Sequence, residues 1–232
     1  MSRPLIILRP EPGNSASRAR ALEQGLAVHS YPLFETRPVA WDPPEPSRYV
    51  GVIMTSANAA RLAGADLQRF VHLPLYAVGE VTADAARAAG FASIVSGDGD
   101  VERLLGKIAT LGLNRLLHLS GADYQPVSPH GVEVDRRTVY EAIGVTPAPG
   151  LVEALAAGGV VMLHSGRAAN QFAALVDGHQ IDRARLAVAA ISEAAAQAAG
   201  AGWQAVTVAK RPRDGALLDS ATRLCKIVEQ GD

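Results

Sequence analysis

The chain has 232 residues, of which 48% are hydrophobic and 19% charged, and its formal net charge is −1. This composition is that of a folded globular protein and not of a disordered segment, and the length suits two domains of about 110 residues each. A net charge near zero gives no global field for nucleic acid or an anionic membrane, so neither is an expected partner, and an anionic ligand must be held by local groups.

The cysteine content and the hydropathy of the chain bear on disulfides, metal sites and membrane segments. Cys225 is the single cysteine, so no internal disulfide can form, and no Cys/His group has the spacing of a metal site. The apolar run at residues 5–8 is too short for the core of a secretory signal, and no run approaches the length that crosses a bilayer. We therefore expect a cytoplasmic protein that needs no metal and does not bind membranes.

Short apolar runs alternate with alanine-rich stretches along most of the chain. The runs lack polar alternation, which is typical of strands buried on both faces of a parallel sheet. They predict strands over residues 5–8, 28–31, 50–54, 75–78, 92–95, 116–119, 160–163, 186–190 and 205–208. The stretches between them predict helices, for instance over 15–24, 81–89, 101–110 and 193–199, with Gly25, Gly90, Gly112 and Gly200 at the expected C-caps. The pattern predicts a doubly wound α/β fold.

Two parts of the chain resemble each other. Gly-Val-Ile-Met-Thr-Ser at 51–56 is echoed by Gly-Val-Val-Met-Leu-His-Ser at 159–165, and the segments at 76–86 and 190–199 form a second matched pair. The repeat distance of about 110 residues is far longer than the repeats of solenoids, so it indicates two similar lobes. Two lobes form a cleft, and clefts are where ligands bind.

Loop-rich breaks with proline precede both copies, near 38–46 and 144–150. Only about 35 residues stand before the first break, too few to bury a core alone, so they must complete the lobe that holds the second copy. We predict a discontinuous first lobe over 1–35 plus 144–232 and a second lobe over 39–138. The chain crosses between them at 33–39 and 138–143, and these crossings are predicted to pair as a two-stranded linker.

Candidate ligand contacts stand in the loops that follow the strands, because doubly wound sheets bind ligands at the carboxyl ends of their strands. These loops are rich in Ser, Thr, Asn and Gly, and the amides of the helix N-termini that follow attract carboxylates and phosphates. The candidates are Thr55, Ser56, Ser120, Gly121, Ser165, Gly166 and Ser192, with Arg9 and Arg167 as carboxylate partners. Helix capping by itself also explains the serines, and a solvated surface position also explains either arginine, so both interpretations stay open.

Several familiar sites are absent from the sequence. It has no Gly-x-Gly-x-x-Gly after the first strand, no Gly-Lys-Ser/Thr loop and no Gly-x-Ser-x-Gly elbow, which argues against a dinucleotide, a nucleoside triphosphate and a serine hydrolase. His118 lies inside a strand-like run and is expected to be a packed core histidine. His164 stands beside Ser165 at a strand end, but its counterpart in the other copy is Thr55, which argues against a catalytic pair with the serine.

Six segments, in order along the chain, resemble the uroporphyrinogen-III synthase family. They are Leu-Arg-Pro at 8–10, Met-Thr-Ser-Ala-Asn-Ala at 54–59, Tyr-Ala-Val-Gly-Glu at 76–80, Val-Tyr-Glu at 139–141, Met-Leu-His-Ser-Gly-Arg at 162–167 and Ala-Ile-Ser-Glu at 190–193. The resemblance implies two flavodoxin-like lobes joined by a two-stranded linker. It also implies a cyclising hydro-lyase of tetrapyrrole (heme) biosynthesis, which closes linear hydroxymethylbilane to uroporphyrinogen III with loss of water and inversion of the last pyrrole ring.

The family's reaction gives roles to particular residues. Loss of the terminal hydroxyl gives an azafulvene, ring attack gives a spiro intermediate, and fragmentation with recombination inverts the last ring; no cofactor is implied. Tyr140 matches a family tyrosine that faces the cleft and helps the hydroxyl leave, although a hinge tyrosine that only packs is the alternative. Thr82 matches a family threonine that either contacts a substrate arm or caps its helix. Ala194 and Ala195 stand where some members carry threonines, so backbone amides and Ser192 are expected to hold the substrate there.

Two other functions remain open on the sequence. One is a two-lobed protein that closes on a small anion without chemistry, and the other is a catalytically degenerate synthase-like regulatory domain. For the synthase, the expected partner is the polycarboxylate linear tetrapyrrole alone, and the expected state is a monomer.

Overall fold

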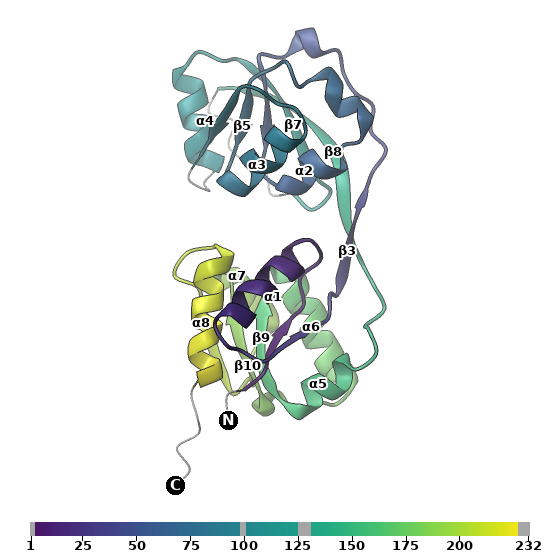
Figure 1. The fold of residues 1–232 in the computed structure, drawn as a ribbon, viewed down its shortest axis with the longest axis vertical. Helices are drawn as coiled ribbons and strands as arrows, with labels where there is room; N and C mark the ends of the chain where they lie inside the picture. The colour runs from purple at the N-terminus through teal and green to yellow at the C-terminus, as the bar shows by residue number, and fades with distance from the viewer. Residues whose placement is uncertain (1–2, 98–100, 125–130, 227–232) are drawn as a thin grey trace. The chain divides into compact units, whose positions relative to one another are not determined.

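The computed structural model describes residues 3–97, 101–124 and 131–226 (Figure 1). The chain divides into two compact units: unit 1 is Met1–Glu35 with Gly144–Asp232, and unit 2 is Thr36–Ile143. Unit 1 is therefore built from both ends of the chain. The first and last residues of the lobe predicted over 1–35 plus 144–232 lie outside the described ranges.

Unit 1 contains a five-stranded parallel sheet in the order β11-β10-β9-β1-β2. Its strands are β1 (Leu5–Ile7), β2 (Val28–Ser30), β9 (Gly159–Leu163), β10 (Leu186–Ala190) and β11 (Ala205–Val208). Counted along the chain within the unit, this order is 2-1-3-4-5, that of flavodoxin-like folds. Every residue of β1, β9 and β10 is buried, as their unbroken apolar runs predict.

Helices cover both faces of this sheet. They are α1 (Gly13–Glu23), α5 (Leu151–Ala157), α6 (Gly166–Gly178), α7 (Glu193–Ala199) and α8 (Asp214–Lys226), with a short 3-10 turn at Arg183–Arg185. The helix α1 connects β1 to β2. The helices α6 and α7 connect β9 to β10 and β10 to β11, so that the chain there moves along the sheet in the opposite direction. Right-handed crossovers therefore put α1 and the α6–α7 pair on opposite faces, and α8 packs on the face of α1 (Figure 1).

Unit 2 contains a six-stranded sheet in the order β3-β8-β7-β4-β5-β6. Its strands are β3 (Phe34–Pro38), β4 (Gly51–Met54), β5 (Leu75–Ala77), β6 (Ile94–Ser96), β7 (Arg115–Gly121) and β8 (Glu133–Gly144). The strands from β8 to β6 are parallel. The strand β3 runs antiparallel to β8, since Val39 donates its amide to the Val139 carbonyl and Val145 donates to Leu33.

The helices of unit 2 again form two layers around the sheet. They are α2 (Ala57–Leu62), α3 (Glu80–Ala88) and α4 (Val101–Thr110), with 3-10 turns at Pro46–Arg48 and Ala65–Arg69. The side chains of Val52, Met54 and Leu117 pack against α2 and α3, whereas Ile53 and Leu116 pack against α4. Alternate residues of each strand therefore enter alternate layers of the core.

Five strands of the unit 2 sheet have the same layout as the unit 1 sheet, with a different chain connection, and β3 is an additional edge strand. The strands β4, β5 and β6 take the places in unit 2 that β9, β10 and β11 take in unit 1, and β7 and β8 take those of β1 and β2. This relation is a circular permutation of one strand arrangement. The sequence repeat at 51–56 and 159–165 corresponds to β4 and β9, which hold the same central place in each sheet.

The strands and helices predicted from the sequence outside the linker segments begin and end within two residues of the observed boundaries. Gly25, Gly90, Gly112 and Gly200 have positive φ angles of 74°, 105°, 71° and 76°, as C-cap glycines require. The strand predicted over 92–95 begins two residues later, at Ile94. The predicted linker segment 33–39 contains β3, whereas 138–143 forms the second half of the 12-residue β8, whose first half belongs to the sheet.

Candidate functional site

Topology places one candidate site on each unit. In unit 1 the chain moves from β1 and from β9 in opposite directions along the sheet, and in unit 2 it does so from β4 and from β7. Open α/β sheets bind ligands at such switch points, outside the carboxyl ends of the strands. The loops after these four strands hold Arg9, His164, Ser165, Thr55, Ser56 and Ala122, with Ser120 and Gly121 ending β7.

At the edge of unit 1, four side chains converge on the carboxylate of Asp214, the first residue of α8. Arg9 Nη1 lies 2.8 Å and His164 Nε2 2.7 Å from Asp214 Oδ1. The Ser17 hydroxyl donates to the same oxygen at 2.6 Å, and Arg20 pairs with Oδ2. Arg9 also donates to Ser17 Oγ at 3.2 Å. The carboxylate therefore ties together α1, α8 and the loops after β1 and β9.

The charges in this cluster do not cancel. Burial by itself raises the pKa of Asp214, but hydrogen bonds from His164, Ser17 and Arg20 outweigh it and hold that pKa well below its usual range. Burial, with a smaller contribution from Arg9, lowers the pKa of His164 below its ordinary value in spite of Asp214, so the imidazole is neutral at pH 7. Two guanidinium groups thus face one carboxylate, which leaves a net positive charge at this edge of unit 1.

The three loop serines cap helices. Ser56 Oγ accepts from the Asn58 amide at 3.2 Å, Ser165 Oγ from Ala168 at 3.1 Å and Ser192 Oγ from Ala195 at 3.3 Å. The capping interpretation is therefore confirmed for all three. It does not compete with ligand contact, because a hydroxyl that accepts from an amide keeps its own O–H to donate to a carboxylate. At the third of these sites the donating amide is that of Ala195.

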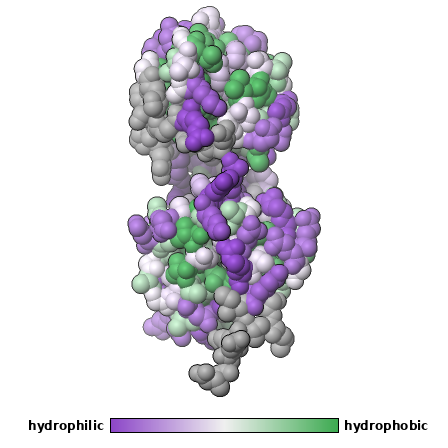
Figure 2. Space-filling model, turned by 90° about the vertical axis from the view of Figure 1, so that its left-hand side faces the viewer, coloured by the Kyte–Doolittle hydropathy of each residue, from purple (hydrophilic) through white to green (hydrophobic). Residues whose placement is uncertain are grey.

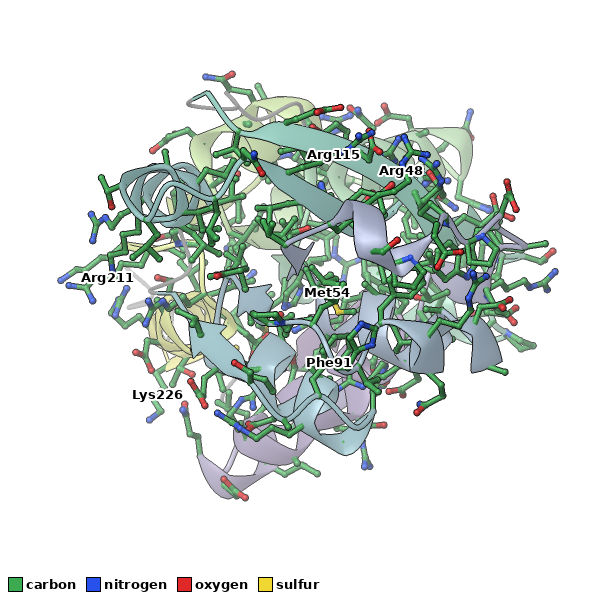
Figure 3. The ribbon with its side chains drawn as sticks, turned by 90° about the horizontal axis from the view of Figure 1, so that it is seen from above. Arg48, Met54, Phe91, Arg115, Arg211 and Lys226 are labelled. Carbon is green, nitrogen blue, oxygen red and sulfur yellow. The ribbon has the colours of Figure 1, made fainter. Side chains whose placement is uncertain are left out.

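Two other predicted contacts in unit 1 are accessible. Arg167 is exposed, and its guanidinium carbon lies 4.7 Å from the centre of the Phe34 ring. Gly166 is the first residue of α6, where backbone amides have no partner within the helix. Arg211, in the loop after β11, is exposed and extends away from the ribbon (Figure 3).

At the edge of unit 2, Tyr140 is a residue of β8, and its ring lies against the end of the neighbouring strand β7. A Cβ atom placed on Gly121 would lie 2.6 Å from Tyr140 Cζ and 2.9 Å from its hydroxyl oxygen, so the ring rests directly on the glycine backbone. Ser120 and Gly121 are buried, whereas Tyr140 is half-buried. Arg136 on β8 donates to Ser120 Oγ at 2.7 Å and to the Gly121 carbonyl at 2.5 Å.

His118 lies further inside β7 and is 1% exposed, which confirms its expected place in the core. Its Nε2 is 3.5 Å from Thr55 Oγ1, and its ring meets Tyr124 edge-on with centroids 5.5 Å apart. Its Nδ1 is buried and has no hydrogen-bond partner among the described residues. Burial, with a smaller contribution from Arg136, lowers the pKa of His118 to about 4. The imidazole is therefore neutral at pH 7.

The structure thus connects some predicted residues and separates others. Thr55, Ser120, Gly121 and Tyr140 are linked by contacts through His118, Tyr124 and Arg136. Thr55 itself is exposed and directly follows Met54, which is fully buried (Figure 3). Thr82 is in the first turn of α3 and only 6% exposed, and the N-cap of that helix is Gly79 without a side-chain bond.

Sequence reasoning missed Asp214, Ser17, Tyr124 and Arg136. Asp214 is an acidic residue at a helix N-terminus, where a negative charge is ordinarily favourable and indicates no site. Arg136 sits in a polar strand that resembles a solvated linker. Their partners lie far along the chain or across strands, so no local pattern indicates them.

Comparison with known proteins supplies the family. The family model described as uroporphyrinogen-III synthase HemD matches residues 15–219. The chain belongs to the uroporphyrinogen-III synthase family. Members of this family are cyclising lyases of tetrapyrrole biosynthesis.

The solved uroporphyrinogen-III synthase of Helicobacter pylori shares the fold. The Helicobacter pylori protein is 18% identical, with a TM-score of 0.64, and the match covers 96% of this chain and 99% of that one. A mutant of the Thermus thermophilus protein is also 18% identical, with a TM-score of 0.46 and coverage of 95% and 98%. No curated protein matches this sequence.

Within residues 3–97, 101–124 and 131–226, no group of three or more His, Cys, Asp or Glu is arranged to hold a metal ion. No helix in these ranges has the length and apolar character needed to cross a bilayer. The face drawn in Figure 2 is largely hydrophilic, with apolar residues in separate small patches.

Acidification is expected to destabilise unit 2 through His118. Its pKa of about 4 in the folded state lies below the ordinary value of 6.5, so the unfolded chain takes up the proton first as the pH falls. Stability is therefore lost from about pH 6.5 downward, by about 3 kcal/mol at pH 4. Denaturant unfolding followed by the fluorescence of Trp41, in a Trp203→Phe background, measures this unit alone.

His118→Phe keeps the aromatic contact with Tyr124 and removes the buried titratable group. This variant is expected to show a shallower pH dependence between pH 6.5 and 4. His72→Gln, at a histidine of the same unit that is not in the core, is the matched control and keeps the wild-type slope. Equal slopes in wild type and His118→Phe would contradict the assignment.

Asp214→Asn is expected to destabilise unit 1 by about 2–4 kcal/mol, because it leaves two guanidinium groups without their shared counter-charge in a partly buried place. Unfolding followed by Trp203, in a Trp41→Phe background, measures the change. Asp177→Asn breaks an exposed ion pair with Arg183 in the same unit and is expected to have little effect. Equal losses of unfolding free energy in the two variants would show that the Asp214 cluster stabilises unit 1 no more than an exposed ion pair does.

Proposed function

We propose that this chain converts hydroxymethylbilane to uroporphyrinogen III with Tyr140 assisting the departure of the terminal hydroxyl. The observation that supports this role is the position of Tyr140 at the carboxyl end of β7, beside the switch point of unit 2, with its ring on Gly121. A phenol can donate its proton, or a hydrogen bond, to a leaving oxygen. The pyrrole rings drive the subsequent electron flow themselves, so the protein need supply only this assistance and the correct substrate geometry.

We further propose that the strand-end loops of both units hold the carboxylate arms of the substrate. The chain is nearly neutral, so these contacts must be local. In unit 1, Ser165, Gly166, Arg167 and Ser192 offer hydroxyl, amide and guanidinium donors, and the Asp214 cluster adds net positive charge beside them. Arg9 belongs to that cluster, so its guanidinium meets a substrate carboxylate only while it also binds Asp214.

In unit 2, Thr55 and Ser56 are the accessible hydroxyl donors after β4. Ser120 and Gly121 are buried, so their contribution is to shape the end of β7 and the seat of Tyr140. Thr82 is nearly buried and is not the N-cap of α3, so its proposed contribution to substrate binding is to shape the first turn of that helix.

The proposed setting is a monomer in the cytoplasm. Each unit has its own hydrophobic core, and Cys225 is a buried free thiol, in keeping with a reducing compartment. The partner is the small-molecule linear tetrapyrrole alone.

The decisive experiment supplies hydroxymethylbilane, generated in situ, and separates the uroporphyrinogen isomers formed. The chain is expected to produce the type III isomer faster than spontaneous closure produces type I. An unchanged isomer ratio with tight substrate binding would instead support the small-anion binding protein, and an unchanged ratio without binding would support the degenerate regulatory domain.

Tyr140→Phe is expected to lower kcat by about 100-fold, the lower end of what a positioned proton donor contributes at a leaving group. The same isomer assay measures it, and circular dichroism checks that folding is kept. Tyr76→Phe, at a buried tyrosine of β5, is the matched control and retains wild-type turnover. Full turnover by Tyr140→Phe would remove this residue from the mechanism.

A further inference from the structure

We propose that Arg136 is a positioning residue that places Tyr140 for the reaction, an inference that rests on the role proposed for Tyr140. Arg136 lies on β8, and its guanidinium reaches across to the end of the neighbouring strand β7. It does not need to touch the substrate. Its effect is exerted through the backbone on which the tyrosine ring rests.

The contacts of Arg136 converge on three consecutive residues. Nε donates to Ser120 Oγ at 2.7 Å, and Nη2 donates to the Gly121 carbonyl at 2.5 Å and approaches the Ala122 carbonyl at 3.4 Å. The guanidinium carbon lies 4.5 Å from the centre of the Tyr124 ring, which covers it. A planar guanidinium with donors fixed at known angles suits this role, whereas a lysine ammonium on a flexible stem does not.

The end of β7 needs such support because the strand pairing is irregular there. Ser120 pairs with Thr138, but the next residue, Gly121, pairs with Tyr140, so Val139 is one residue extra on β8. A bulge of this kind interrupts the hydrogen bonds of the ladder. Arg136 binds the Gly121 carbonyl at the irregularity, and regular bonding resumes when the Ala122 amide donates to the Tyr140 carbonyl at 2.9 Å.

The seat of Tyr140 is the backbone that Arg136 holds. The phenol ring lies so close to Gly121 that a Cβ there would approach Tyr140 Cζ to 2.6 Å. A displacement of Gly121 therefore displaces the ring and its hydroxyl. Small errors in the position of a reacting group are costly in rate, which makes the clamp on Gly121 part of the catalytic geometry.

The test compares Arg136→Lys with Arg137→Lys, which keeps the charge at the next position of the same strand. Arg137 contacts the Asp42 and Arg136 carbonyls instead of the end of β7. Arg136→Lys is expected to lower kcat about tenfold with little change in KM and to raise the proportion of type I product. Arg137→Lys retains wild-type values.

A double-mutant cycle shows whether Arg136 acts through Tyr140. In a Tyr140→Phe background, Arg136→Lys is expected to cause no further loss, because the group it positions is already gone. A full tenfold loss in both backgrounds would overturn the inference, even if Tyr140 is catalytic. If Arg136→Lys folds poorly, Ser120→Ala takes its place in the experiment. This variant removes one hydrogen-bond acceptor of Arg136, and we expect it to lower kcat by a smaller factor.

A structural readout separates this inference from the proposed function. With 3-fluorotyrosine incorporated at position 140, Arg136→Lys is expected to shift or broaden the ¹⁹F resonance, and Arg137→Lys leaves it in place. An unmoved resonance in Arg136→Lys would refute the positioning claim whatever the activity. A shifted resonance together with full activity of Tyr140→Phe would confirm the placement while removing the proposed catalytic role.

Discussion

The carboxyl edge of each sheet imposes one requirement on the rest of the structure: strands buried on both faces must end, and the polar groups exposed where they end must find partners. Inside the sheets, the ladder satisfies backbone groups and apolar side chains fill both layers. At the edge the ladder stops. Serine caps, the Asp214 cluster and the Arg136 clamp are the partners found there, and they fix the loops that carry the proposed chemistry.

The two units meet this requirement differently although five strands in each have the same layout. In unit 1 a low-pKa carboxylate gathers Arg9 and Arg20 and leaves positive charge at the edge. In unit 2 the equivalent edge holds a neutral buried His118 and a clamped tyrosine. Circular permutation explains how they diverge: the strand beside the central one comes from the chain's N-terminus in unit 1 and from β7 in unit 2, so different loops supply the side chains.

The strand β8, which carries Tyr140, is subject to the same requirement. The strand β8 belongs to the sheet at its start and pairs with β3 further along, and the irregular pairing with β7 lies between these two parts. Tyr140 stands just after the irregularity. A tyrosine at this point therefore lies on a strand that is flanked by β7 on one side and by β3 on the other.

Much of the fold could be predicted from the residues themselves. Unbroken apolar runs such as that of β9 mark strands covered on both faces, and Gly25 or Gly200 marks a helix end because a left-handed residue is needed there. The serines before α2, α6 and α7 are N-caps, as their places at the strand ends predict. These features depend on neighbours within a few residues, and such interactions leave a pattern in the sequence.

The residues that meet at each candidate site depend on contacts between distant parts of the chain. The sequence by itself determined the α/β class, the internal repeat, the strand ends and the family, because these depend on local preference and on the order of segments. Only the tertiary structure decided that Arg9 binds Asp214, 205 positions away, and that Arg136 holds the glycine beneath Tyr140. Such partners are chosen by strand order and register, which bring distant residues within hydrogen-bonding distance without any local periodicity.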